Sequence, residues 1–160
     1  MQMVVSQNTL KWLMRLYPPL FFQRIWVIGF YDDFKQVNVK VNKSLLNKNP
    51  NGSIFGGTIM TAADPFYPVM FSHLLDRKGE KKLRIWSKSV RVDFLKPALT
   101  NLFFQITLTD DEVNEALEIL TAIGKFEKVY HIEMYNKKNE VCAAVAIEVY
   151  VRDLTYQPVF

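Results

Sequence analysis

The chain has 160 residues, of which 49% are hydrophobic and 22% are charged, as is typical of a globular domain and not of a disordered chain. The net charge of +4 permits anion binding, but the basic residues are scattered and no nucleic-acid-reading motif accompanies them, so we expect no nucleic-acid partner. The single cysteine excludes an internal disulfide, and the first residues lack the features of a signal peptide, which together favour the cytoplasm.

The N-terminal segment predicts a helix over about residues 6–17, with Ser6 as its N-cap and Pro18-Pro19 as its stop. Its apolar positions at helical spacing are Leu10, Leu13, Met14 and Tyr17. Such a helix either packs on the sheet or lies on a membrane surface with Lys11 and Arg15 outward. We favour packing, because the polar side is lightly charged for a membrane-surface helix. Charges and prolines also interrupt the roughly 20 apolar residues that a membrane span requires.

Alternation of apolar and polar residues predicts six antiparallel strands. Their approximate ranges are 25–31, 37–41, 82–94, 102–108, 126–135 and 141–151. In the third of these we expect Trp86, Val90, Val92 and Phe94 to share one face. A short helix is predicted over 110–123, with a possible capping box from Thr109 to Glu112 and Gly124 as its stop.

The longest stretch without clusters of turn residues runs from Ile54 to Leu75, and Asp64 is its only ionised residue. This composition predicts a helix over about 57–75 that is buried on nearly all sides. A curved antiparallel sheet is the one predicted element able to enclose it. We therefore expect a single α+β domain over residues 1–160, in which a six-stranded antiparallel sheet wraps a long central helix.

Asp64 is followed directly by Pro65, and Pro68 comes soon after. Each proline removes a helical hydrogen bond, so the helix should kink near Asp64 and leave the carbonyls of Thr61 and Asp64 without a helical partner. A lone buried carboxylate is costly, so that of Asp64 should be paired, protonated or exposed to water in a cleft. Alternatively, Asp64 only caps a second half-helix that begins at Pro65.

A glycine pair, Gly56-Gly57, stands where the central helix should begin. Without side chains, a ligand can approach the free amides of the first turn, where the helix dipole favours negative charge. Such amides can hold a polarised carbonyl oxygen, as an oxyanion hole does. Gly57 lies about 10 Å from Asp64 along an ideal helix, whereas one reacting carbon should lie about 3 Å from both groups. If both act, they come from different subunits, which predicts a dimer.

Other reactive side chains give weaker signals. The two histidines, His73 and His131, are far apart in the sequence, so we expect no metal site. Cys142 lies between apolar residues of a strand, which is typical of a small buried side chain rather than a nucleophile.

These motifs resemble those of the hotdog-fold thioesterases of the phenylacetyl-CoA type, which carry Asn, Gly, His-Gly-Gly and then Asp along the helix. The matching residues are Asn49, Gly52, Gly56-Gly57 and Asp64, with Phe55 in place of the histidine. The chain is more similar to an uncharacterised branch of that superfamily, over roughly residues 10–151. The shared motifs are Pro18-Pro19, Phe55-Gly56-Gly57, Asp64-Pro65, Trp86-Ser87-Lys88 and Phe94-Leu95-Lys96-Pro97.

The resemblance implies a hotdog fold and an acyl-CoA thioesterase that assembles as a homodimer or tetramer. It further implies that the Gly57 amide binds the thioester carbonyl, that Asp64 activates water or attacks, and that Asn49 positions the substrate. It implies no cofactor beyond the coenzyme A of the substrate. Lys88, Arg91 and Lys96 either meet the phosphates of coenzyme A or form a solvated strand edge.

For the acyl pocket we predict apolar and aromatic residues, because ligand cavities are largely of that kind. The predicted set is Phe55, Gly56, Phe66, Tyr67 and Phe71. A non-catalytic acyl- or acyl-CoA-binding module is the main alternative function, favoured by Phe55 and by Asp64-Pro65. A purely structural dimer is the third.

Overall fold

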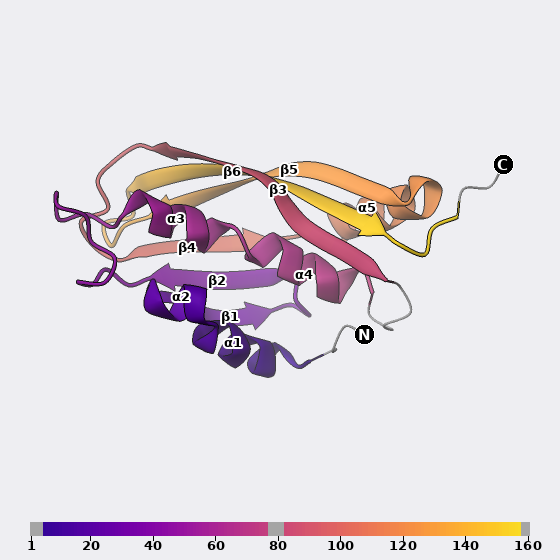
Figure 1. The fold of residues 1–160 in the computed structure, drawn as a ribbon, viewed down its shortest axis with the longest axis horizontal. Helices are drawn as coiled ribbons and strands as arrows, with labels where there is room; N and C mark the ends of the chain where they lie inside the picture. The colour runs from indigo at the N-terminus through magenta and orange to yellow at the C-terminus, as the bar shows by residue number, and fades with distance from the viewer. Residues whose placement is uncertain (1–4, 77–81, 158–160) are drawn as a thin grey trace.

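Six antiparallel strands form one twisted sheet, and two helices in series lie across it (Figure 1). The computed structural model describes residues 5–76 and 82–157. The strands are β1 Ile25–Tyr31, β2 Gln36–Val41, β3 Leu83–Phe94, β4 Leu102–Thr107, β5 Lys125–Tyr135 and β6 Val141–Asp153. They are ordered β1-β2-β4-β5-β6-β3 in the sheet. The sequence prediction of six antiparallel strands is confirmed.

The two edges of the sheet differ. The helices α1 (Gln7–Leu16) and α2 (Pro18–Phe22) lie along β1 (Figure 1). At the other edge β3 pairs with β6 on one side, and no other strand in the described ranges pairs with it. An unpaired strand edge presents backbone donors and acceptors to a further strand.

The N-terminal helix begins and packs as predicted. The Ser6 hydroxyl accepts a hydrogen bond from the Thr9 amide at 3.1 Å, which confirms the N-cap. Leu10 and Met14 are buried, so the packing interpretation is confirmed. At Tyr17 the backbone becomes extended and the proline pair starts α2, because proline is well suited to the first turn of a helix.

The central helix is broken in two at the predicted place. α3 (Gly56–Ala63) and α4 (Phe66–Leu74) are separated by Asp64 and Pro65. Because Pro68 has no amide hydrogen, the Asp64 carbonyl lacks its helical donor. The Ser87 hydroxyl of β3 fills that place and donates to the Asp64 carbonyl oxygen at 2.9 Å.

A bulge in β3 overturns one prediction. The pairing of β3 with β6 shifts register between Ser87 and Ser89, and the alternation of faces changes there. Trp86 therefore lies on the opposite face from Val90 and Val92, where its ring contacts that of Tyr150 in a tilted arrangement, 4.3 Å between centroids. A pattern of strict alternation cannot register the extra residue, so the expectation that Trp86 shares a face with Val90 was wrong.

The remaining helix, α5 (Asp110–Ile123), packs on β5 and β6. Its capping box between Thr109 and Glu112 is confirmed in both directions. Gly124 ends it with φ of 72°, a conformation that costs glycine little.

Candidate functional site

The start of α3 differs from the starts of α1 and α5. Ser6 caps α1 and Thr109 caps α5, but Phe55 occupies the N-cap position of α3 and its side chain accepts no hydrogen bond from the helix. The first backbone bond into this turn runs from the Thr58 amide to the Phe55 carbonyl at 3.0 Å. Within the described residues the amides of Gly56 and Gly57 donate to no acceptor. Two amides at the positive end of the helix are therefore free for a ligand.

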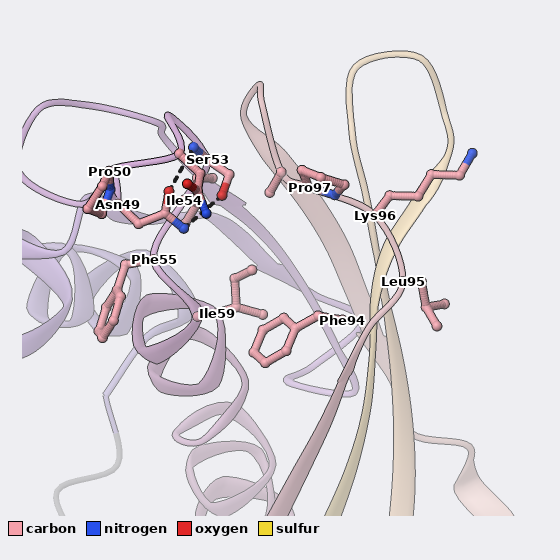
Figure 2. A pocket seen from close by; sticks show the side chains of 13 residues that line it. Asn49, Pro50, Ser53, Ile54, Phe55, Ile59, Phe94, Leu95, Lys96 and Pro97 are labelled. Atoms are coloured by element: carbon pink, nitrogen blue, oxygen red, sulfur yellow. Dashed lines mark hydrogen bonds between the residues drawn. The ribbon is translucent and has the colours of Figure 1, made fainter.

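Each glycine of the pair lies under an aromatic ring. A Cβ atom at Gly56 would lie 2.9 Å from the tip of the Phe94 ring, and one at Gly57 would collide with the ring of Phe55. Figure 2 shows the two rings on opposite sides of the helix start. Both rings are 57% exposed. The absence of side chains at both glycines thus lets two aromatic rings pack closely against the start of α3.

A cavity of about 580 Å³ lies on the Phe94 side, between α3 and the end of β3 (Figure 2). We call it the Phe94 cavity. Its lining residues are Asn49, Pro50, Asn51, Ser53, Ile54, Phe55, Gly56, Ile59, Phe94, Leu95, Lys96, Pro97 and Ala98. A largely apolar lining of this kind suits an acyl chain.

Asn49 lines this cavity, but its amide group is already bonded. Its side-chain nitrogen donates to the Ser53 hydroxyl at 2.8 Å, and its side-chain oxygen accepts from the Ser53 amide at 3.1 Å. These bonds close the loop that precedes α3, as Figure 2 shows. The predicted positioning residue therefore shapes the wall of the cavity through the loop.

A second pocket, of about 380 Å³, lies on the Gly57 side, and we call it the Gly57 pocket. Its lining residues are Gln23, Leu46, Asn47, Lys48, Phe55, Gly57, Thr58 and Thr61. The Thr61 hydroxyl donates to the Gly57 carbonyl at 2.9 Å and accepts from the Gln23 side chain at 3.2 Å. This pocket is the more polar of the two, and it contains the predicted oxyanion donor.

Asn47 holds the Gly57 pocket together and was missed by the sequence interpretation. It is buried, and its side-chain nitrogen donates to the carbonyls of Gln23 at 2.8 Å and Asn42 at 2.9 Å. Its backbone carbonyl accepts from the Phe55 amide at 2.7 Å. The sequence offered three asparagines in one loop, and nothing in their spacing separates the buried one from Asn49.

Asp64 lies on the exposed side of the central helix, not in its interior. Gly57, Met60, Thr61 and Asp64 form one stripe at helical spacing that is exposed or partly exposed. The expectation that the helix is buried on nearly all sides is wrong for α3, since Met60 is 43% exposed. The carboxylate is exposed to water, but Asp64 lines neither the Phe94 cavity nor the Gly57 pocket, so the expected exposure within a cleft is not what these pockets show. Within one chain Gly57 and Asp64 lie about two helical turns apart.

The aromatic residues predicted for the acyl pocket lie elsewhere. Phe66, Tyr67 and Phe71 belong to α4 and are at most 3% exposed. The Tyr67 ring stacks on Tyr130 at 4.4 Å, and burial raises the pKa of the Tyr67 hydroxyl. These side chains line neither the Phe94 cavity nor the Gly57 pocket, whereas Phe55 lines both and Gly56 lines the first.

The basic residues near the site form ion pairs. Lys88 pairs with Glu127 and Glu148, and Lys96 pairs with Glu140 at 2.8 Å. The Glu140 carboxylate raises the pKa of Lys96, which therefore stays charged. Of these cations only Lys96 lines the Phe94 cavity. Among the described residues no group of three or more His, Cys, Asp or Glu side chains is arranged to bind a metal, and Cys142 is buried.

A comparison with protein families assigns the chain. Residues 11–151 match the model of the family described as Domain of unknown function (DUF4442). The chain belongs to this family. No curated protein sequence matches it closely enough to count as a relative.

The solved structures similar to this DUF4442 chain include a thioesterase and a probable thioesterase. Thioesterase HI1161 from Haemophilus influenzae has a TM-score of 0.68 and 14% identity, over 98% of this chain and 97% of that one. The Escherichia coli PaaI protein from the phenylacetic acid degradation operon has a TM-score of 0.59 and 18% identity, over 91% and 95%. PA5026 from Pseudomonas aeruginosa, described as a protein of unknown function and probable thioesterase, has a TM-score of 0.79 and 15% identity, over 94% and 98%.

These likenesses, which span nearly the whole chain, show the fold. The DUF4442 chain has the hotdog fold, with its antiparallel sheet against a central helix, as the resemblance implied. No helix in residues 5–76 or 82–157 has the length and apolar character that crossing a bilayer requires.

Proposed function

We propose that this protein hydrolyses an acyl thioester, with coenzyme A as the thiol carrier. The observation that carries the proposal is the uncapped start of α3, where the Gly56 and Gly57 amides are free between two pockets. In the reaction the Gly57 amide would hold the thioester carbonyl oxygen and stabilise the negative charge that develops on it. Hotdog neighbours that are thioesterases by name support this reading of the site.

The carboxylate that completes the site would be Asp64 of a second copy. Within one chain the spacing of two helical turns keeps Asp64 from a carbon held at Gly57. Asp64 is exposed on the same stripe as Met60, and β3 offers an unpaired edge beside it. We therefore propose a homodimer in which the partner's carboxylate acts as the base or nucleophile at the Gly57 amide.

A specific observation favours a second function. The Phe55 ring lies against Gly57, where a carbonyl oxygen would have to approach, and Asn49 is bonded within its own loop. A protein that binds an acyl group or acyl-CoA without hydrolysing it does not require a carbonyl oxygen to reach the Gly57 amide. The rival function is therefore a non-catalytic acyl-binding module of the same fold.

A panel of acyl-CoA thioesters separates the two functions. The thioesterase releases free thiol, which a colorimetric thiol reagent detects, and at least one chain length should be turned over. The binding module instead raises the melting temperature with the same ligands and releases no thiol, because a ligand that binds the folded state stabilises it. A protein that neither turns over nor is stabilised by any ligand would refute both proposals.

Subunit mixing tests the shared site. The variants Asp64→Asn and Gly57→Val should each be inactive, because the first removes the carboxylate and the second blocks the amide. Unfolding both together and refolding the mixture produces heterodimers with one site in which both groups are intact. Activity that returns on mixing supports a site built from two subunits. Folded variants that stay inactive as a verified heterodimer would place both groups in one chain and contradict the proposal.

A further inference from the structure

The outward side of α1 and α2 is apolar. Leu16 and Phe22 are each 65% exposed, and four other large side chains of the segment from Trp12 to Phe22 are exposed as well. The set is Trp12, Leu13, Leu16, Tyr17, Phe21 and Phe22, and we call it the α1–α2 patch. Contiguous exposed apolar surfaces of soluble proteins mark places where something binds.

The core of the fold uses other residues of these two helices. α1 buries Leu10 and Met14, and α2 buries Leu20, on the opposite side of each helix. The membrane-surface alternative for this helix places Lys11 and Arg15 outward, on a polar side. That outer side is instead apolar in its second half, so the helix packs with one side and offers the other.

Three basic residues accompany the patch in the sequence, and no acid lies near them in the chain. The first 31 residues contain Lys11, Arg15 and Arg24 but neither Asp nor Glu. The Arg15 guanidinium lies between two indole rings, 4.6 Å from the Trp12 centroid and 4.2 Å from that of Trp26, and its Nε donates to the Val27 carbonyl at 2.8 Å. Lys11 lies 5.7 Å from the Trp12 ring. Cations are thus fixed at the border of the apolar surface.

We propose that the α1–α2 patch seats the protein on the surface of an anionic lipid bilayer. Leucine and aromatic side chains that project from helices insert at the boundary between headgroups and acyl chains, and adjacent basic residues attract the lipid phosphates. A second copy is a poorer occupant, because a two-fold contact would bring Lys11, Arg15 and Arg24 of both copies together. The patch lies at the β1 edge, so it leaves the β3 edge free (Figure 1).

The patch borders the Gly57 pocket. Gln23 follows Phe22 directly, lines that pocket and donates to the Thr61 hydroxyl. Leu46, which is 70% exposed, lines the same pocket. A protein seated on this patch would hold the mouth of the Gly57 pocket close to the lipid surface. The inference concerns binding alone, and it does not depend on thioester hydrolysis.

Vesicle flotation tests the proposal. The protein should float with vesicles of mixed phosphatidylglycerol and phosphatidylcholine, less with phosphatidylcholine alone, and less again as salt is raised. The double variant Leu16→Ser/Phe22→Ser should lose roughly tenfold or more of the partition coefficient, because it removes two inserted apolar groups. Ile123→Ser is the matched control, since Ile123 is an exposed aliphatic residue at the end of α5, just as Leu16 is at the end of α1.

Charge reversal gives an independent arm. Lys11→Glu should weaken binding to the mixed vesicles, whereas Lys138→Glu, in the exposed turn before β6, should leave it unchanged. Unchanged melting temperatures would show that each variant is folded. No flotation of the wild type, or flotation that Leu16→Ser/Phe22→Ser leaves intact, would overturn the proposal. So would a larger assembly that the double variant dissociates while vesicles bind neither form, because the patch would then be covered by a second copy.

Discussion

The two halves of the central helix differ in what surrounds them. α4 buries Phe66, Tyr67, Met70, Phe71 and Leu74, each at most 3% exposed, and meets aromatic rings from β4 and β5. α3 buries only one side and leaves the stripe from Gly57 to Asp64 exposed or partly exposed. The two segments share one apolar stretch of sequence, yet one is enclosed by the sheet and the other lies partly outside it.

Because of this difference, α4 contributes mainly to the stability of the fold, whereas α3 is accessible to a ligand. Side chains of α4 have many neighbours, so any change there acts on folding. The exposed groups of α3 have few neighbours, so they can be exchanged at little cost and can meet a ligand or a second copy. The break at Asp64 and Pro65 marks the boundary, and Ser87 holds it by its bond to the Asp64 carbonyl. Substitutions on the two sides of this boundary should therefore have different effects.

The largest effect on folding is expected in α4. Phe71→Ala should lower the free energy of unfolding by about 3–5 kcal/mol, because it empties a space enclosed by Phe126 and Tyr130. Urea denaturation followed by circular dichroism measures the change. A loss below about 1 kcal/mol would show that α4 is not the enclosed half.

The next effect concerns activity on the α3 side. Asp64→Asn should reduce thioester hydrolysis by roughly a hundredfold or more, the scale of losing a positioned acid or base. The melting temperature should hardly change, because the carboxylate is exposed and α4 has no side-chain cap that the substitution could remove. Turnover measured at saturating acyl-CoA, for the wild type and for Asp64→Asn, tests this prediction. Wild-type turnover in this variant would dismiss Asp64 as the catalytic group.

A smaller effect is expected where β3 holds the boundary. Ser87→Ala should cost about 1 kcal/mol of stability, because it removes the donor to a carbonyl that proline has already left without its helical partner. Ser89→Ala is the control on the same strand, since beyond the bulge Ser89 bonds the Glu148 carboxylate at an exposed position. Equal losses in the two variants would show that the bond to α3 has no special role.

The fold was predictable because the alternation of apolar and polar residues and the positions of helix-breaking prolines are local features of the sequence. Alternation located six strands, and Pro65 with Pro68 located the break in the central helix. Composition could not reveal how much of α3 is enclosed, because an apolar stretch of sequence looks alike whether a sheet covers it or not. The bulge at Ser87–Ser89 was equally hidden, since one extra residue leaves the composition of a strand unchanged.

The candidate site was only partly predictable. The glycine pair and its free amides followed from the sequence, because residues without side chains at a helix start leave the first amides open to a ligand. The functions of Asn47, Gln23 and Phe94 depend on which distant segments meet, and no periodicity encodes that. The acyl-pocket prediction placed Phe66, Tyr67 and Phe71 by residue type, but the sheet surrounds these rings and leaves no lining surface.

The smallest effect on folding should come from Phe55, which shares residue type with Phe71 but lies at the exposed start of α3. Phe55→Ala should change the free energy of unfolding by less than about 0.5 kcal/mol, because the ring is 57% exposed.

The same Phe55 ring lines both the Phe94 cavity and the Gly57 pocket, so its loss should weaken ligand contact. We expect KM for acyl-CoA to rise roughly fivefold, equivalent to about 1 kcal/mol of aromatic contact, with kcat unchanged. Steady-state kinetics with the best substrate of the panel measures both constants. A fall in KM would mean that the ring obstructs the Gly57 amide rather than grips the substrate, and a loss of stability near that of Phe71→Ala would erase the distinction between the two halves of the helix.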